Sequence, residues 1–188
     1  MSTIRGSRRS RTALRLAIGV VLVLAGLGGA GFPVYVAPTT DALRPADAVL
    51  ILGGPGYARY PFGLELAAEG WAPMVVISNP NGARDPWLTE YCAAPHTNPA
   101  VQCFAPDPPT TRGEGAMLRQ MADEHGWRRV IVVTFRPHIS RARFILERCF
   151  AGELVMAASP THLSAWEWAS EYAYQSAGFA RAVLQPGC

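Results

Sequence analysis

One segment, residues 130–143 (VIVVTFRPHISRAR), constrains the fold of this chain more than any other. The apolar run 130–133 is typical of a strand that is buried on both faces of a sheet. After a break at residues 134–137, apolar residues recur at helical spacing, which predicts a helix. A strand that leads directly into a helix ends at the carboxyl edge of a parallel sheet, where open α/β folds bind ligands. The segment therefore predicts an α/β protein with a binding site at this junction.

The polar side chains of the junction favour an anionic ligand. Pro137 suits the first turn of a helix, because its missing N–H would have no partner there. His138 and Arg141 share one face of that turn, and Thr134 and Arg136 precede it. Free backbone N–H groups, the positive end of the helix dipole and these basic side chains together make an anion site. We expect all four side chains to contact the ligand, with a purely structural His138 as the alternative.

The rest of the chain alternates predicted strands with predicted helices. This alternation implies a parallel, three-layer α/β sandwich with a five-stranded, mostly parallel sheet. A strand order of 3-2-1-4-5 would place the first and fourth strands side by side at the switch point. The expected strands are residues 47–52, 74–77, 101–104, 129–133 and 154–157, and the expected helices are 62–69, 112–125, 137–148 and 163–182, with a loop at 80–99.

The N-terminus carries a candidate membrane anchor. Five arginines precede an uncharged stretch, residues 16–40, whose apolar part is long enough to cross a bilayer. A cleaved signal peptide is the alternative, since residues 16–27 form a short apolar core and small residues follow it. Apolar residues resume at 32–36, which favours an uncleaved anchor.

Arginines beside a membrane span stay in the cytoplasm, so the rest of the chain is expected outside. The protein would then be a single-pass protein of the plasma membrane whose C-terminal domain is extracytoplasmic. The expected organisation is a basic cytoplasmic segment (1–15), a transmembrane signal anchor (16–37), a linker (38–46) and an α/β domain (47–188).

Composition argues against one class of partner and indicates disulfides. Beyond the anchor, 12 arginines face 14 acidic residues, and a near-neutral domain is not expected to bind nucleic acid. All four cysteines follow the anchor, and an even number in an exported domain favours disulfides over buried thiols. Cys92 and Cys103 bracket a short loop and are expected to pair, which leaves Cys149 with Cys188. The chain has no C-x-x-C motif and its histidines are scattered, so no metal site is predicted.

A glycine-rich turn follows the first expected strand. Gly53 and Gly54 would let a ligand approach the backbone closely, and Arg59 lies just past the turn. The turn is not G-x-G-x-x-G, and Ser78 rather than an acidic residue ends the second strand, so a nicotinamide site is disfavoured. We expect these four residues to line the ligand site. A tight turn without a binding role is the alternative for the glycines, and a solvent-exposed side chain is the alternative for Arg59.

The sequence TRGE at residues 111–114 precedes an apolar helical pattern. Thr-x-x-Glu in this position is typical of a capping box, and the local pattern favours that structural interpretation for Thr111 and Glu114. Capping does not account for Arg112, which would project near the same sheet edge. A carboxylate placed close to His138 could instead act as a general base or hold the imidazole. Glu114 and His138 are thus the candidate catalytic residues, and Thr111 and Arg112 are candidate ligand contacts.

Several sequence blocks together resemble the YdcF/SanA/ElyC family. They are ADAVLILGG, then Arg59, then GWAPMVVISN, TRGEGA and VVTFRPHISRAR, and they span nearly all of the expected α/β domain. The most specific block is V-T-x-x-x-H-x-x-R-A at residues 133–142. The TRGE form of the second motif and the cysteine pair around the middle loop resemble the actinobacterial branch.

The resemblance implies a Rossmann-like domain, often behind one N-terminal membrane helix, in proteins of cell-envelope biogenesis. Family members have been linked to peptidoglycan assembly, to the polyprenyl-phosphate carrier and to the envelope barrier to vancomycin. One cytoplasmic branch has been associated with S-adenosylmethionine.

Three hypotheses of function follow. In the first, the domain binds or processes an anionic envelope intermediate, a polyprenyl phosphate or a peptidoglycan precursor, with Glu114 as the base. In the second, it is a non-catalytic regulator or scaffold that contacts envelope-assembly proteins. In the third, it binds S-adenosylmethionine, which would require access to a cytoplasmic cofactor. The residues themselves identify no cofactor. In the first hypothesis the anion is held by Arg112, Arg136, His138 and Arg141.

Overall fold

A five-stranded sheet forms the centre of the protein in the computed structural model, which describes residues 4–97 and 99–188. Its strand order, β3-β2-β1-β4-β5, is the order that the sequence predicts, and every neighbouring pair is parallel. The strands are β1 (Ala48–Ile51), β2 (Met74–Ser78), β3 (Ala100–Phe104), β4 (Arg129–Phe135) and β5 (Glu153–Ser159).

Strands β1 and β4 lie side by side in the middle of the sheet. Leu50 pairs with Val132, and Ile51 pairs with Val133. All four side chains are inaccessible to solvent, as the unbroken apolar runs predict for strands covered on both faces. The N–H of Leu52 donates to the carbonyl of Val133 at 3.0 Å and extends this pairing to the glycine turn. The carboxyl ends of β1 and β4 therefore meet at one edge of the sheet.

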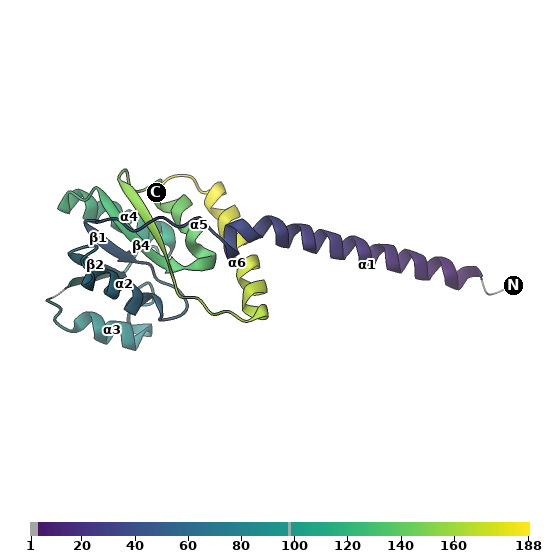
Figure 1. Ribbon diagram of the computed structural model, residues 1–188, viewed down its shortest axis with the longest axis horizontal. Helices are drawn as coiled ribbons and strands as arrows, with labels where there is room; N and C mark the ends of the chain where they lie inside the picture. Colours follow the sequence, from purple (N-terminus) through teal and green to yellow (C-terminus); the bar gives the residue numbers. More distant parts are fainter. Residues whose placement is uncertain (1–3, 98) are drawn as a thin grey trace.

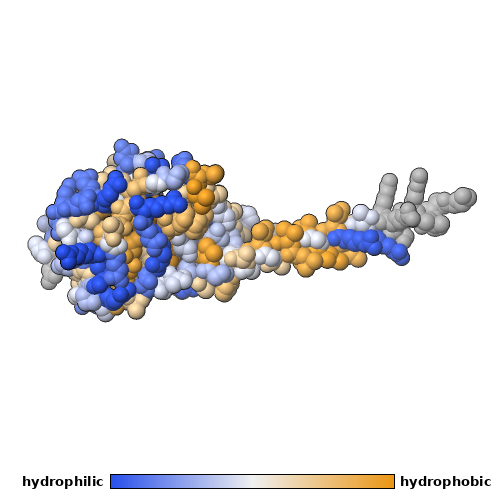
Figure 2. Space-filling view, turned by 90° about the horizontal axis from the view of Figure 1, so that it is seen from above, coloured by the Kyte–Doolittle hydropathy of each residue, from blue (hydrophilic) through white to orange (hydrophobic). Residues whose placement is uncertain are grey.

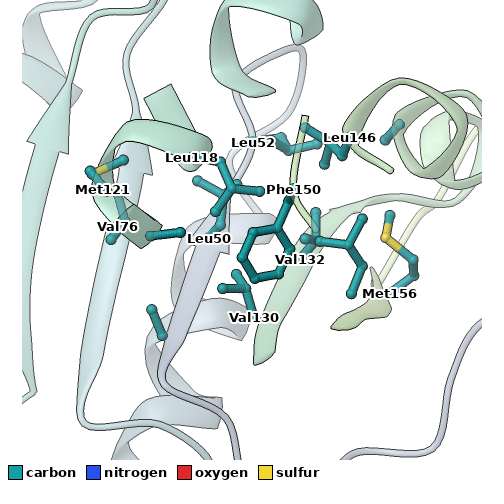
Figure 3. Close-up of a cluster of buried hydrophobic side chains, with 14 of the residues drawn as sticks. Leu50, Leu52, Val76, Leu118, Met121, Val130, Val132, Leu146, Phe150 and Met156 are labelled. Atoms are coloured by element: carbon teal, nitrogen blue, oxygen red, sulfur yellow. The ribbon is translucent and has the colours of Figure 1, made fainter. Parts of the chain in front are cut away.

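Helices cover both faces of the sheet (Figure 1). They are α2 (Arg59–Ala68), α3 (Pro86–Ala93), α4 (Thr111–His125), α5 (Ile139–Leu146) and α6 (Ala165–Leu184). Alternate residues of β1 belong to different cores, because successive side chains of a strand point to opposite faces. Leu50 packs in one cluster with Leu118 of α4, as Figure 3 shows. Ile51 packs in the other cluster with Leu66 of α2 and Leu88 of α3.

A long N-terminal helix, α1 (Ile4–Gly31), projects from the domain and continues into a short π-helical segment, η1 (Phe32–Val36) (Figure 1). Residues 11–36 are long and apolar enough to cross a membrane, a property that an N-terminal signal sequence shares. Figure 2 shows the apolar surface of α1 next to the domain and basic residues farther toward its N-terminus. The predicted anchor at residues 16–37 coincides with this apolar helix.

The prediction of a loop at residues 80–99 is wrong in part. This segment contains α3 and a short 3-10 turn, η2 (Gly82–Arg84). The carboxylate of Asp85 caps α3 by accepting from the N–H of Leu88 at 3.0 Å. Pro86 occupies the first helical position, where proline is favoured. The buried side chain of Leu88 then holds the helix against the sheet. The start of this helix was not predicted because the proline-rich composition of the segment is typical of a loop.

Two further predictions about helices need correction, and one about cysteines is confirmed. Helix α2 begins at Arg59, before the predicted start at residue 62, so Arg59 belongs to the helix and not to the turn. The helix predicted at 137–148 is a 3-10 turn, η3 (Arg136–His138), followed by the shorter α5. Both predicted disulfides, Cys92–Cys103 and Cys149–Cys188, are present.

Candidate functional site

A cavity of about 840 Å³ opens at the carboxyl edge of the sheet. Its walls come from the turns that follow β1 and β3, from the first turn of α4, and from one side each of α5 and α6. A ligand site is expected in this position in an open parallel sheet, and its size is typical of small-molecule sites. Predicted site residues that line the cavity are Gly53, Gly54, Thr111, Arg112, Glu114, His138 and Arg141.

Four arginines line this cavity, and two of them were not predicted. Arg112 and Arg141 were expected, whereas Arg148 and Arg181 were not. Arg141 donates from Nε to Oε1 of Gln175 at 2.7 Å, so its terminal nitrogens keep donors for a ligand. The position of Arg148, two helical turns after Arg141, is a signal that could have found it. Only tertiary packing of α6 brings Arg181 to the site.

Glu114 lies at the base of the cavity and does not form the capping box that its sequence context favours. Thr110 caps α4 instead, accepting from the N–H of Gly113 at 3.4 Å. Glu114 is 3% exposed, and its Oε1 accepts a hydrogen bond from the N–H of Gly53 at 2.7 Å. This contact ties the start of α4 to the glycine turn after β1. The carboxyl group is thus freed from local capping and placed at the wall of the cavity.

Burial raises the pKa of Glu114 above its usual value. The Ser78 hydroxyl, the N–H of Gly53 and the charges of Arg59 and Arg141 act in the opposite direction but do not cancel the effect of desolvation. A carboxyl group with a raised pKa holds a proton more strongly, which makes it a better proton acceptor whenever it is ionised. This is the property that a general base in the first hypothesis requires.

We expect Glu114→Gln to be more stable than the wild-type protein at pH 7. A carboxyl whose pKa is raised by folding contributes stability below its unfolded-state value, 4.5, and loses it as the pH rises through the folded-state value. Glutamine cannot ionise, so the variant lacks this loss, and its advantage should shrink as the pH falls toward 4.5. Urea unfolding across this pH range measures the difference. A constant difference at every pH would contradict the raised pKa.

His138 lies between two threonine hydroxyls. Its Nδ1 is 3.0 Å from Oγ1 of Thr134, and its Nε2 is 3.2 Å from Oγ1 of Thr111. Desolvation lowers the pKa of His138 well below 6.5, and the charges of Arg141 and Arg59 lower it further. The ring is therefore neutral at pH 7, with one nitrogen donating and the other accepting. His138 contacts the hydroxyl of Thr111 at the cavity wall, and its lowered pKa favours the neutral ring over the cationic one.

Arg59 does not line the cavity and has a structural role instead. It is 1% exposed. Its guanidinium donates to the carbonyls of Leu52 and Gly53 at 3.1 and 2.7 Å, and also to those of Pro55 and Gly56. These bonds fold the glycine turn around the guanidinium. Arg59 is thus a positioning residue, and its prediction as a ligand contact is not supported by the geometry.

Three other predicted contacts lie outside the cavity wall. Thr134 is fully buried behind His138. Arg136 is exposed, because the 3-10 turn η3 directs it away from the cavity. The Oγ of Ser78 is buried and makes no hydrogen bond to a described residue, although it lies close enough to Glu114 to lower the pKa of that carboxyl. Thr134 therefore supports His138, and Ser78 supports Glu114, from the side away from the cavity.

Glycine is required at several positions of the turn: Gly56 has φ +80°, and a Cβ on Gly53 would lie 2.5 Å from the ring of Pro80. Gly54 has φ +129°, a backbone conformation that residues with a Cβ rarely adopt. A Cβ there would also lie 3.0 Å from Nη1 of Arg59. The absence of a side chain therefore lets the turn pack closely against Arg59.

The chain matches no model of a protein family, no curated protein and no solved structure. The chemistry of the cavity therefore has to be argued from its own residues. Within residues 4–97 and 99–188, no three or more His, Cys, Asp and Glu side chains come together in a way that could hold a metal ion. The arrangement offers guanidinium donors, a buried carboxyl group and a neutral imidazole.

Proposed function

We propose that this protein is a membrane-anchored, extracytoplasmic member of the YdcF/SanA/ElyC family that binds an anionic cell-envelope intermediate. The observation that carries the proposal is the set of four arginines around one cavity that has a buried carboxyl group at its base. Guanidinium groups bind phosphate through paired, charge-assisted hydrogen bonds. A polyprenyl phosphate or a phosphorylated peptidoglycan precursor supplies the matching group.

The balance of charge in the cavity favours an anion over S-adenosylmethionine. Asp107 and Glu114 are the acidic residues of the wall, and the raised pKa of Glu114 reduces its negative charge. Four guanidinium groups then outweigh one exposed carboxylate. S-adenosylmethionine carries a net positive charge, so this wall would repel it.

The proposed location rests on the N-terminal helix and the cysteines. Residues 11–36 are apolar enough to cross a membrane, and the arginines that precede them support a domain on the outer side. Two disulfides join all four cysteines, as is usual in an oxidising compartment. Processing of the ligand would use Glu114 as the base, with His138 and Thr111 in the wall of the same cavity.

The test of this proposal compares two exposed arginines. Arg112→Ala is expected to weaken binding of geranyl phosphate to the full chain in detergent micelles by about tenfold, equivalent to ~1.4 kcal/mol. Arg136→Ala is the matched control, because Arg136 is also exposed but does not line the cavity. Isothermal titration calorimetry measures both affinities. Geraniol lacks the phosphate, so its affinity should be the same for the wild type and for both variants.

Each alternative result points to a different conclusion. Equal losses for the two variants would mean that overall charge, and not the cavity, attracts the ligand. If titration of the wild-type protein produced no heat of binding, the result would contradict the proposed anion site and favour the scaffold hypothesis. In that case Glu114→Gln and His138→Gln should still restore the envelope of a deletion strain.

A further inference from the structure

Helix α6 lies across the base of α1 (Figure 1). The hydroxyl of Tyr172 donates to the carbonyl of Gly28 at 3.2 Å, and the rings of Tyr172 and Tyr35 meet edge to face at 5.0 Å. The hydroxyls of Tyr35 and Ser176 are 2.9 Å apart. A Cβ on Gly31 would clash with the ring of Tyr172, so the two helices approach closely. The contact is formed by residues of the apolar segment 11–36.

One side of α6 is an exposed apolar stripe. Trp166 is 82% exposed and Leu184 is 80% exposed, at opposite ends of the helix. At 100° per residue they lie on the same face, and four exposed alanines fall between them on that face. The charged residues of α6 lie outside the stripe. The alanines are Ala169, Ala173, Ala177 and Ala180.

An adjacent side of α6 closes the cavity, and Ala177 belongs both to the stripe and to the cavity wall. Gln175, Gly178 and Ala182 line it, and Gln175 holds Arg141 in place. The disulfide between Cys149 and Cys188 ties the segment after α6 to the end of α5. The cavity therefore opens beside the exposed stripe of α6.

We infer that α6 lies in the outer interface of the membrane beside α1, so that the cavity opens next to lipid headgroups. This inference rests on the proposed anchoring by α1. Because α6 contacts α1 within the apolar segment, insertion of α1 brings the stripe of α6 to the bilayer surface. An exposed tryptophan at one end and an exposed leucine at the other are typical of a helix that lies along this surface. The occupant of the stripe is therefore the lipid bilayer.

This placement deepens the proposed function by naming the direction from which the ligand arrives. A polyprenyl phosphate has its chain in the bilayer and its phosphate at the headgroup level. With α6 at the interface, the phosphate reaches the arginines without the chain leaving the lipid. The class of substrate is thus a membrane-embedded anionic lipid.

Tryptophan quenching tests the position of α6. The full chain is placed in bilayers whose phospholipids are brominated near the headgroup, and its emission is compared with that in unbrominated bilayers. Trp166→Phe is expected to remove most of the quenchable emission. Trp87→Phe is the matched control, because Trp87 is 47% exposed on α3, far from α1 in Figure 1. Equal quenching in the wild type and both variants would overturn the inference.

A binding experiment gives a second, independent readout. Trp166→Glu is expected to weaken capture of a long-chain polyprenyl phosphate from the bilayer by about tenfold, the scale of one buried aromatic side chain. Its affinity for geranyl phosphate in micelles should not change, since Trp166 does not line the cavity. Equal losses for both ligands would overturn the inference.

Liposome flotation tests the proposed anchoring by α1 separately from the inferred position of α6. A chain that does not float with liposomes would disprove the anchor, and the interfacial position of α6 would fall with it. A chain that floats but shows no quenching of Trp166 would disprove only the position of α6. Flotation together with quenching supports both.

Discussion

The free energy of unfolding is expected to fall by about 3–5 kcal/mol when Arg59 is replaced by methionine. The guanidinium of Arg59 is buried and donates to four backbone carbonyls in and before the turn that follows β1. Methionine has a similar length but donates no hydrogen bond, so all four carbonyls lose their donor, and that of Leu52 loses it where water has little access. The turn that forms one wall of the cavity loses its support at the same time.

Urea unfolding of the full chain in detergent micelles, followed by near-ultraviolet circular dichroism, measures this loss. Arg119→Met is the matched control, because Arg119 is exposed on α4 and surface substitutions change stability by about 0.5 kcal/mol or less. Arg59→Lys keeps the charge but lacks the planar guanidinium. Its loss of unfolding free energy should therefore lie between those of Arg59→Met and Arg119→Met. If Arg59→Met lowers the free energy of unfolding no more than the control does, the turn holds its shape without the guanidinium.

The second large effect concerns His138 and the stability of the protein in mild acid. The pKa of His138 is lower in the folded protein than in the unfolded chain, so the unfolded chain takes up the proton first as the pH falls. Its contribution to stability is complete above pH 6.5 and is lost as the pH falls from 6.5 toward the folded-state pKa. The slope from one such group reaches about 1.4 kcal/mol per pH unit.

His138→Gln is expected to remove this slope. Glutamine retains a donor and an acceptor for the two threonine hydroxyls but does not titrate. Unfolding free energies at pH 7.5, 6.5 and 5.5, compared between variant and wild type, measure the effect. The slope from Glu114 has the opposite sign above pH 4.5, so the double variant with Glu114→Gln isolates each contribution. A wild-type protein whose imidazole titrates near pH 6.5 by NMR would contradict the lowered pKa.

The topology could be predicted from the sequence because the strands are strongly marked. The apolar runs of β1 and β4 are continuous, and each is followed at once by a turn into a helix. The glycine turn and the residues after β4 were therefore placed together correctly. The start of α3 was missed because Asp85-Pro86 lies in a proline-rich segment, where a cap and a loop look alike.

The site was predicted less completely than the fold, for physical reasons that differ between residues. Thr110 and Thr111 are adjacent, and local pattern alone does not decide which one caps α4. The choice matters, because it turns Glu114 from a capping side chain into one at the base of the cavity. Arg59 carries the charge expected of a ligand contact, yet the carbonyls of the preceding glycine turn occupy its guanidinium. Arg181 comes from a helix whose packing no local pattern describes.

The pairing of β1 with β4 also has a consequence for the kinetics of folding. The half-sheets β3-β2-β1 and β4-β5 each join strands that are neighbours in sequence, whereas Ala48 pairs with Val130 across the whole length from α2 to α4. Closing so long a loop is slow, because its entropy is lost before the contacts form. Since the cavity takes walls from both halves, we expect it to appear at the rate of this closure. A nascent chain that ends before β4 has no binding site.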